Sequence, residues 1–255
     1  MARQHWLGRL VLPALAAFGC VGGTAKAELV TTFIGTDPNQ QVFVQATKPG
    51  DTRGFETPVG PFNFVVLSDT SGTGLGPTFR SFCGDFFQDV ALGQNYTFTP
   101  VAFSDLPDVA GNATKIAKIQ ELYDRFYDVA TDAEKGAAFQ LALWKILYDP
   151  NNDDLSTGNF TASGPGSPTS IPLAQSWLNM IDDPNVADPA HKYTLTGLLS
   201  PTSQDQIVPA AAPVPAPAGV VLLVIGAVGL IARRKFAGKK ADAEAAAETT
   251  EEAKA

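Results

Sequence analysis

The sequence predicts an α+β protein: a β-rich N-terminal half, forming a sandwich or an open barrel, with two to three helices after it. Three observations lead to this prediction. Short apolar stretches that alternate with period two, separated by turn residues, fill residues 28–106. From residue 114 onward, apolar residues recur at helical spacing instead. Strands followed by helices, rather than strands alternating with helices, are typical of α+β domains.

The β-rich half contains five predicted strands. Alternation is clearest over residues 41–46, and the stretch 70–76 is rich in Gly, Ser and Thr, which indicates a loop. The fourth strand contains Cys83. The five strands are predicted at residues 29–34, 41–46, 62–67, 79–86 and 96–103.

The second half begins with two long predicted helices. Residues 114–130 carry apolar residues at helical spacing and follow Asn112 or Thr114, either of which suits an N-cap. The next helix follows Thr131 or Asp132 and ends where Asp149-Pro150 interrupts it. The remaining elements are a polar loop at residues 151–171, a short helix at 173–181 and strands at 191–195 and 206–208.

A glutamine lies in the middle of the apolar face of the second long helix. At 100° per residue, Gln140 shares this face with Leu143 and Trp144, whereas Lys145 falls on the opposite, polar face. A primary amide taken out of water without a partner costs roughly 1–3 kcal/mol. We therefore expect a partner for Gln140, and the candidate is Cys83.

Residues 1–27 predict a secretory signal peptide. A basic start precedes an apolar run, and Ala25-Lys26-Ala27 matches an A-x-A cleavage site. Cleavage leaves Cys83 as the single cysteine of the mature chain, which begins at Glu28. The alternatives are an ordinary N-terminus and lipidation at Cys20, whose preceding residues form a poor lipobox.

The C-terminal region predicts an anchor or a sorting signal that contacts the membrane. The apolar run at residues 218–232 spans roughly 22 Å as a helix, against about 30 Å for a hydrocarbon core. Basic residues follow at once, as in a stop-transfer segment. The predicted organisation is a signal peptide (1–27), an extracytoplasmic domain (28–208), an Ala/Pro linker (209–217), a hydrophobic segment with a basic cluster (218–240) and an acidic disordered tail (241–255).

This arrangement resembles the PEP-CTERM class of exported bacterial envelope proteins. Pro215 and Pro217 precede the apolar run, and Arg233 and Arg234 follow it. Ala216 stands where the class has Glu, and the tail is longer than in the class. The resemblance implies processing by an exosortase and export to the cell surface or extracellular matrix. A permanently membrane-anchored protein is the alternative.

The charge and the motif content exclude several classes of function. Between Glu28 and Pro217, 9 Lys and Arg stand against 21 Asp and Glu, which argues against binding nucleic acid. His191 is the one mature histidine, so no complete hydrolase set can be assembled. Zinc-spaced clusters and phosphate-binding glycine motifs are also missing, so we predict no enzyme, no metal and no cofactor. Residues 149–154 begin like a calcium loop, and both a weak site and a solvated loop stay open.

Two short motifs resemble those of bacterial thioester domains. Residues 139–144 (FQLALW) are similar to the T-Q-x-A-I-W motif, and residues 82–85 (FCGD) to the cysteine strand of that family. A phenylalanine replaces the family's Thr, and a glycine replaces a β-branched residue. The resemblance implies that the Cys83 thiolate attacks the Gln140 side-chain carbonyl and expels ammonia. An amine on a partner then opens the thioester and becomes covalently attached.

The physical requirements of a thioester agree with this resemblance. The bond needs a dry pocket, and Trp144 beside Gln140 would supply one; Asp85 would either orient the site or cap a turn. The alternative is an inert, buried Cys83 with Gln140 hydrogen-bonded to backbone. We thus expect an exported structural or adhesive protein with an amine-bearing surface or matrix partner, or else a passive matrix or binding module.

Overall fold

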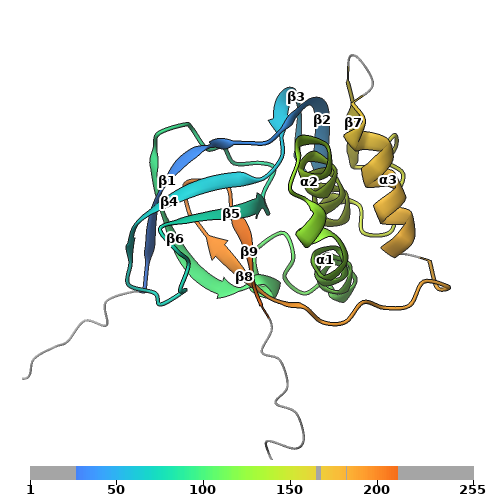
Figure 1. The fold of residues 1–255 in the computed structure, drawn as a ribbon. Helices are drawn as coiled ribbons and strands as arrows, with labels where there is room; N and C mark the ends of the chain where they lie inside the picture. Colours follow the sequence, from blue (N-terminus) through green and yellow to red (C-terminus); the bar gives the residue numbers. More distant parts are fainter. Residues whose placement is uncertain (1–26, 165–167, 182, 212–255) are drawn as a thin grey trace, which may run out of the picture. The chain divides into compact units, whose positions relative to one another are not determined.

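The computed structural model describes residues 27–164, 168–181 and 183–211, and within them the fold is α+β and rich in strands, as predicted (Figure 1). The chain divides into two units. The first runs to Ala190 and resumes over Leu195–Pro209, and it contains all of the site considered below. In the described part of the chain, the second comprises His191–Thr194 and residues 210–211.

Six strands close into a barrel in the order β1-β4-β5-β9-β8-β6. The sequence predicted a sandwich or an open barrel, and closure comes from the two late strands. β8 pairs with β6 and β9 pairs with β5, both antiparallel. These two strands therefore close the barrel between β5 and β6, which precede them in the sequence. The barrel strands are β1 (Leu29–Thr36), β4 (Phe62–Asp69), β5 (Thr78–Cys83), β6 (Asn95–Ala102), β8 (Tyr193–Leu199) and β9 (Gln206–Ala211).

A second, three-stranded sheet has the order β3-β2-β7. β2 (Gln40–Lys48) was predicted, but β3 (Asp51–Val59) and β7 (Phe160–Ser163) were not. β3 contains Gly54 and Pro58, and most of its side chains face solvent, because it is an edge strand. β7 is four residues long and lies inside the predicted polar loop, where its only strand partner is β2.

Three α-helices follow the β-rich half: α1 (Ala113–Phe126), α2 (Ala133–Tyr148) and α3 (Ser170–Ile181). Asn112 caps α1 by accepting from the Lys115 N–H at 3.0 Å, and Asp132 caps α2 by accepting from the Lys135 N–H at 2.8 Å. α1 ends sooner than predicted, because a 3₁₀ turn continues the chain over Tyr127–Val129.

α2 differs from the prediction in its surroundings. It packs against α1, α3 and strands of the second sheet, so every residue from Gly136 to Leu147 is buried (Figure 1). The prediction that Lys145 lies on a polar face of the helix is therefore wrong, since this side chain has no exposed surface. A helix with neighbours on all sides needs no solvent-facing stripe.

Aromatic side chains join β5 and the segment after it to α2. The rings of Phe82 and Phe139 lie 4.2 Å apart between centroids, and Phe86 meets Trp144 edge-on at 5.1 Å. Such pairs contribute about 0.5–1.5 kcal/mol each beyond the burial of their area. They hold the residues on either side of Cys83 against the middle of α2.

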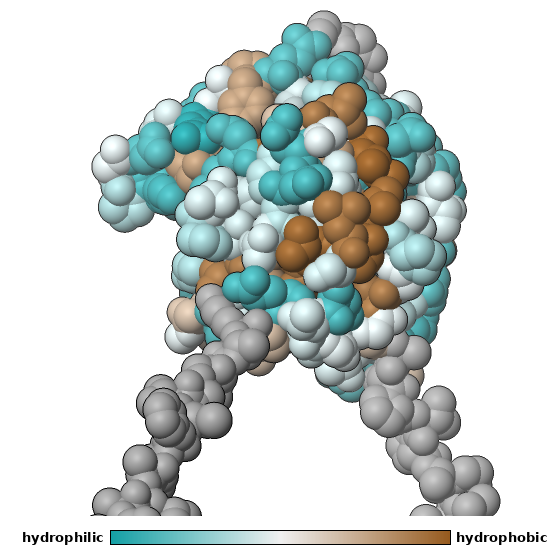
Figure 2. Space-filling model, turned by 90° about the vertical axis from the view of Figure 1, so that its left-hand side faces the viewer, coloured by the Kyte–Doolittle hydropathy of each residue, from teal (hydrophilic) through white to brown (hydrophobic). Residues whose placement is uncertain are grey.

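The surface carries some exposed apolar residues. Ile34 on β1 and Leu67 on β4 are 49% and 53% exposed, and Figure 2 shows apolar residues gathered in a band on the face that it presents. Within the described ranges, no helix is long and apolar enough to cross a membrane. The predicted segment at residues 218–232 lies outside these ranges.

Candidate functional site

The last residue of β5 meets the middle of α2. Cys83 and Gln140 are both fully buried. The Cys83 backbone N–H donates to Gln140 Oε1 at 2.8 Å, and Gln140 Nε2 donates to the Cys83 carbonyl oxygen at 3.1 Å. The side-chain amide thus supplies the pair of hydrogen bonds that a neighbouring strand would supply. The structure brings together the two residues that the sequence singled out.

The Cys83 thiol is enclosed and unpaired with any other cysteine. Its Sγ donates to the backbone carbonyl oxygen of Asp85 at 2.9 Å. Burial raises the pKa of this thiol far above its usual value, and the negative charges of Asp85 and Asp205 act in the same direction. The resting group is therefore a protonated thiol that solvent does not reach.

Asp85 caps a turn with its carboxylate and touches the sulfur through its backbone. Its Oδ1 accepts from the Phe87 N–H at 2.7 Å, which orders the chain just after β5. Burial raises the pKa of this carboxyl. Of the two roles considered for Asp85, the side chain shows the turn-capping one, and the contact with Cys83 belongs to the main chain.

Trp144 closes the pocket one helical turn after Gln140. It is 3% exposed, and its ring lies edge-on to Phe86 and 6.0 Å from Phe160 between centroids. Its indole Nε1 forms no hydrogen bond of regular geometry. Trp144 is therefore part of the apolar surroundings of Gln140, and its indole N–H lacks a regular hydrogen bond.

Sequence reasoning missed three residues around the Cys83 turn. Tyr148 Oη donates to Asp108 Oδ2 at 2.7 Å and accepts from the Phe86 N–H at 2.9 Å. The Asp205 backbone carbonyl accepts from the Gly84 N–H at 2.8 Å. Tyr148 follows Gln140 by eight residues and so shares its helix face, a signal that the sequence does contain. The two aspartates reach the site only through tertiary folding.

Asp205 carries an unusual carboxyl. It is 3% exposed, and its Oδ1 accepts from the Ser200 N–H at 2.8 Å. Burial raises its pKa to about 6, and the negative charges of Asp85 and Asp108 add to this effect. The pKa values of the Asp85 and Asp205 carboxyls, both near the turn after Cys83, are therefore raised.

No family model matches the sequence, and no curated protein sequence matches it either. The structure is similar to that of the N-terminal thioester domain of a surface protein from Clostridium perfringens, at 12% sequence identity and a TM-score of 0.41. The match covers 72% of this chain and 99% of that chain. The chemistry of the site therefore rests on its own geometry.

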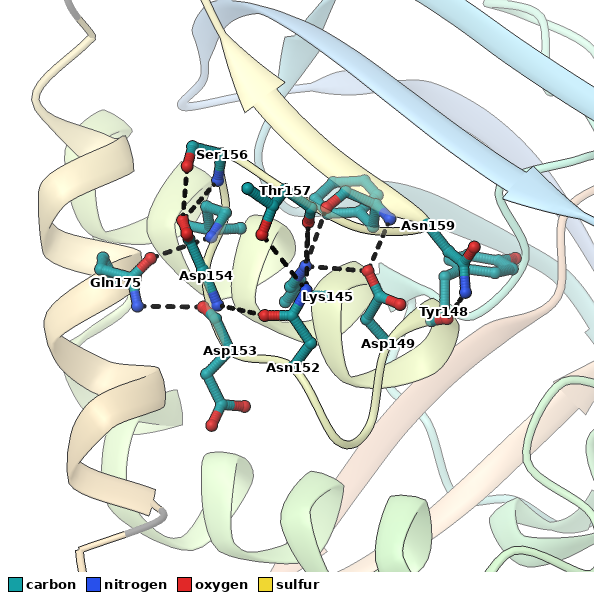
Figure 3. A network of polar contacts seen from close by, with 12 residues as sticks. Lys145, Tyr148, Asp149, Asn152, Asp153, Asp154, Ser156, Thr157, Asn159 and Gln175 are labelled. Carbon is teal, nitrogen blue, oxygen red and sulfur yellow. Dashed lines mark hydrogen bonds and ion pairs between the residues drawn. The ribbon is translucent and has the colours of Figure 1, made fainter.

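A second polar network surrounds Lys145, on α2 (Figure 3). Its ammonium donates to Asp149 Oδ2 at 2.8 Å, to the Thr157 carbonyl at 2.7 Å and to the Phe160 carbonyl at 3.0 Å. All three ammonium donors are thus used. The Asp149 carboxylate also accepts from the Phe160 N–H at 2.9 Å, which connects the start of β7 to the end of α2.

This network bears on the calcium loop considered at residues 149–154. Asp149 faces the Lys145 ammonium, and Asp153 is paired with Lys118 at 3.2 Å, so the two carboxylates do not converge. The described part of the chain holds no group of three His, Cys, Asp or Glu arranged for a metal. The cation that the Asp149 carboxylate and the nearby loop carbonyls bind is the Lys145 ammonium.

The remaining predicted signal residues fall mostly outside the described ranges. Ala27 is the first described residue, and it belongs to no helix or strand. Its partner in the predicted cleavage site, Ala25, lies outside, as do the sorting residues Pro215, Pro217, Arg233 and Arg234.

Proposed function

We propose that Cys83 and Gln140 form an internal thioester, through which the protein attaches covalently to an amine-bearing partner at the cell surface or in the extracellular matrix. The observation that carries this proposal is the pair of reciprocal hydrogen bonds between the Gln140 amide and the Cys83 backbone, both of which are fully buried. It holds the carboxamide beside the residue that bears the thiol.

The hydrogen bonds suit the chemistry of thioester formation. When Sγ attacks Cδ of Gln140, negative charge develops on Oε1, which the Cys83 N–H already contacts at 2.8 Å. The S–Cδ bond forms, the Cδ–Nε2 bond breaks, and the thiol proton leaves with the nitrogen as ammonia. The Cys83 carbonyl orients Nε2, the leaving group, at 3.1 Å. The buried pocket keeps out water that would hydrolyse the product.

The second step couples the partner. A primary amine attacks the thioester carbonyl, an amide forms on the Gln140 side chain, and the Cys83 thiol is released. Because each chain reacts once and the site is consumed, we propose an adhesive or cross-linking role and no enzymatic turnover. The predicted signal peptide and C-terminal sorting or anchor segment belong to the same proposal, because both would deliver the domain outside the cytoplasm.

A passive matrix or binding module is the second candidate, and specific contacts favour it. The Gln140 amide is paired on both sides by backbone, and the thiol proton is paired with the Asp85 carbonyl. Burial also keeps the thiol protonated. An inert cysteine with a structural glutamine would make these same contacts, so the two candidates differ in reactivity and share the resting geometry.

The deciding experiment compares intact masses of the purified full-length protein and its Cys83→Ala variant, before and after methylamine treatment. If the thioester forms, the wild type is lighter by one ammonia than its sequence predicts, whereas the variant has the mass of its sequence. Methylamine then adds once to the wild type and not to the variant. Gln140→Ala should block both changes. A wild type of full mass, with Cys83 alkylated only after denaturation, would establish the passive module.

A further inference from the structure

The indole N–H of Trp144 is a buried donor without a regular partner. Leaving such a group unpaired destabilises the folded state, so its retention needs a reason. Trp144 is 97% buried, since only 3% of its surface is exposed. It lies one turn beyond Gln140 on the same face of α2, so the indole and the carboxamide leave the helix on the same side.

The surrounding rings fix the indole against the cysteine turn. Phe86, three residues after Cys83, meets the indole edge-on at 5.1 Å, and Phe160 lies on another side at 6.0 Å. The Trp144 N–H is also one of the groups that lower the pKa of the Cys83 thiol, although burial outweighs it. The indole N–H and the Cys83 thiol therefore interact, although their geometry falls short of a regular hydrogen bond.

The resting thiol gives this donor little to bind. Cys83 Sγ points its own proton at the Asp85 carbonyl, and a neutral thiol is a weak acceptor. A thiolate in the same pocket would be a strong acceptor and would face the negative charges of Asp85 and Asp205. The N–H thus gains most when the sulfur becomes charged, which is the behaviour expected of a group that stabilises a transition state.

We propose that the indole N–H of Trp144 donates a hydrogen bond to Cys83 Sγ as charge develops on it, both when the sulfur attacks Gln140 and when an incoming amine displaces it. This inference rests on the proposed thioester. It assigns to the tryptophan a chemical role in addition to excluding water. Because the donor is held in place before the reaction, it requires no reorganisation during the step.

Trp144→Phe tests the proposal, because it removes the N–H and keeps an aromatic ring in the wall. The matched control is Trp177→Phe, at a buried tryptophan of α3 that stacks on Phe126. Thioester formation is monitored as the loss of one ammonia from the intact mass. The rate at which methylamine opens the thioester is measured over a pH series. We expect Trp144→Phe to slow both steps about tenfold, about 1.4 kcal/mol, with the control at wild-type rates.

A purely structural tryptophan predicts another pattern. Trp144→Phe would then lower the melting temperature while both rates and their pH profile stay at wild-type values, and this result would overturn the inference and leave the thioester in place.

A second measurement does not depend on the thioester. The indole ¹H–¹⁵N resonance of Trp144 is compared between wild type and Cys83→Ala, with the Trp177 resonance as reference. The inference requires the Trp144 resonance to move when the sulfur is removed, and an unchanged resonance overturns it. A wild type that loses no ammonia instead contradicts the proposed function, whichever way this resonance behaves.

Discussion

At the scale of single residues, one glutamine takes the place of a strand. The Gln140 amide uses its oxygen and its nitrogen on the two backbone groups of Cys83, with donor–acceptor distances of 2.8 and 3.1 Å. An amide is the side chain that both accepts and donates in this geometry. The same amide group that binds the Cys83 backbone also contains the carbonyl carbon that a nucleophile can attack.

Gln140→Glu should therefore be strongly destabilising. A carboxylate cannot donate to the Cys83 carbonyl, and burying it unpaired carries a desolvation penalty, so we expect the free energy of unfolding to fall by about 2–4 kcal/mol at neutral pH. Urea denaturation measures the change. Gln45→Glu, at an exposed position of β2, is the control and should have little effect. Equal effects of the two variants would contradict the structural role of Gln140.

Asp205 predicts a pH dependence of stability. Its pKa is raised from 3.8 to about 6 by burial, so the folded state binds this proton more tightly than the unfolded chain does. The group's contribution to stability therefore falls as the pH rises from about 4 to about 6, and at neutral pH the buried carboxylate weakens the fold by about 3 kcal/mol.

Asp205→Asn should remove this dependence. The amide oxygen can still accept from the Ser200 N–H, which Asp205 Oδ1 contacts at 2.8 Å. Thermal unfolding at pH 4, 5, 6 and 7 should show the variant gaining stability relative to wild type as the pH rises. A constant difference between the two proteins across this range would show that the Asp205 carboxyl titrates normally.

At the scale of elements, α2 is a core helix that keeps one buried cation. Lys145 is fully buried, and its ammonium has three acceptors, of which only Asp149 is charged. Two of these acceptors lie in the loop before β7 and in β7 itself, so the ion pair connects a helix to a strand of the second sheet (Figure 3).

Lys145→Met should lower the free energy of unfolding more than a substitution of a surface lysine does. It leaves the Asp149 carboxylate buried without its cation, which typically costs about 3–5 kcal/mol. Lys135→Met is the matched control on the same helix, because Lys135 pairs with Asp132 near the surface, where ion pairs contribute about 0–1 kcal/mol. Urea denaturation of both variants tests this, and similar losses would mean that the buried pair contributes little.

At the scale of the whole molecule, the site is built from distant parts of the chain. Cys83 ends β5, Gln140 lies in α2, and the Asp205 carbonyl that binds the Gly84 N–H precedes β9. Cys83 also pairs in register with Gln206 of β9. The pairing of β9 with β5 therefore both closes the barrel and brings the Asp205 carbonyl to the cysteine turn.

Ending the chain at Ala190 should consequently abolish the site. This truncation removes β8 and β9, so the barrel stays open and the cysteine turn loses the carbonyl that binds Gly84. A chain ending at Ala211 keeps every strand and serves as the control. Near-ultraviolet circular dichroism should show fixed aromatic packing in the longer chain only. Equal spectra would mean that the early strands and helices order themselves without closure.

Local pattern was enough to predict most elements. Alternation predicted β2, and helical spacing predicted α1 and α2. Short polar side chains offered two candidates for each N-cap, and the structure selects Asn112 and Asp132. The sequence also indicated Gln140, because an amide on the apolar face of a helix needs a hydrogen-bond partner once it is buried. β3 and β7 escaped prediction because an edge strand and a four-residue strand depend on their neighbour β2 more than on their own residues.

The sequence by itself determined the α+β class, the presence of the two long helices and the pairing of a cysteine strand with a glutamine helix. Its signal and sorting segments remain predictions at the ends of the chain. Only the tertiary structure decided that the barrel closes, that Lys145 is buried and that Asp205 approaches the Cys83 turn. The physical reason is range: periodicity and capping act over a few residues, whereas burial and charge proximity depend on segments more than fifty residues apart in the chain.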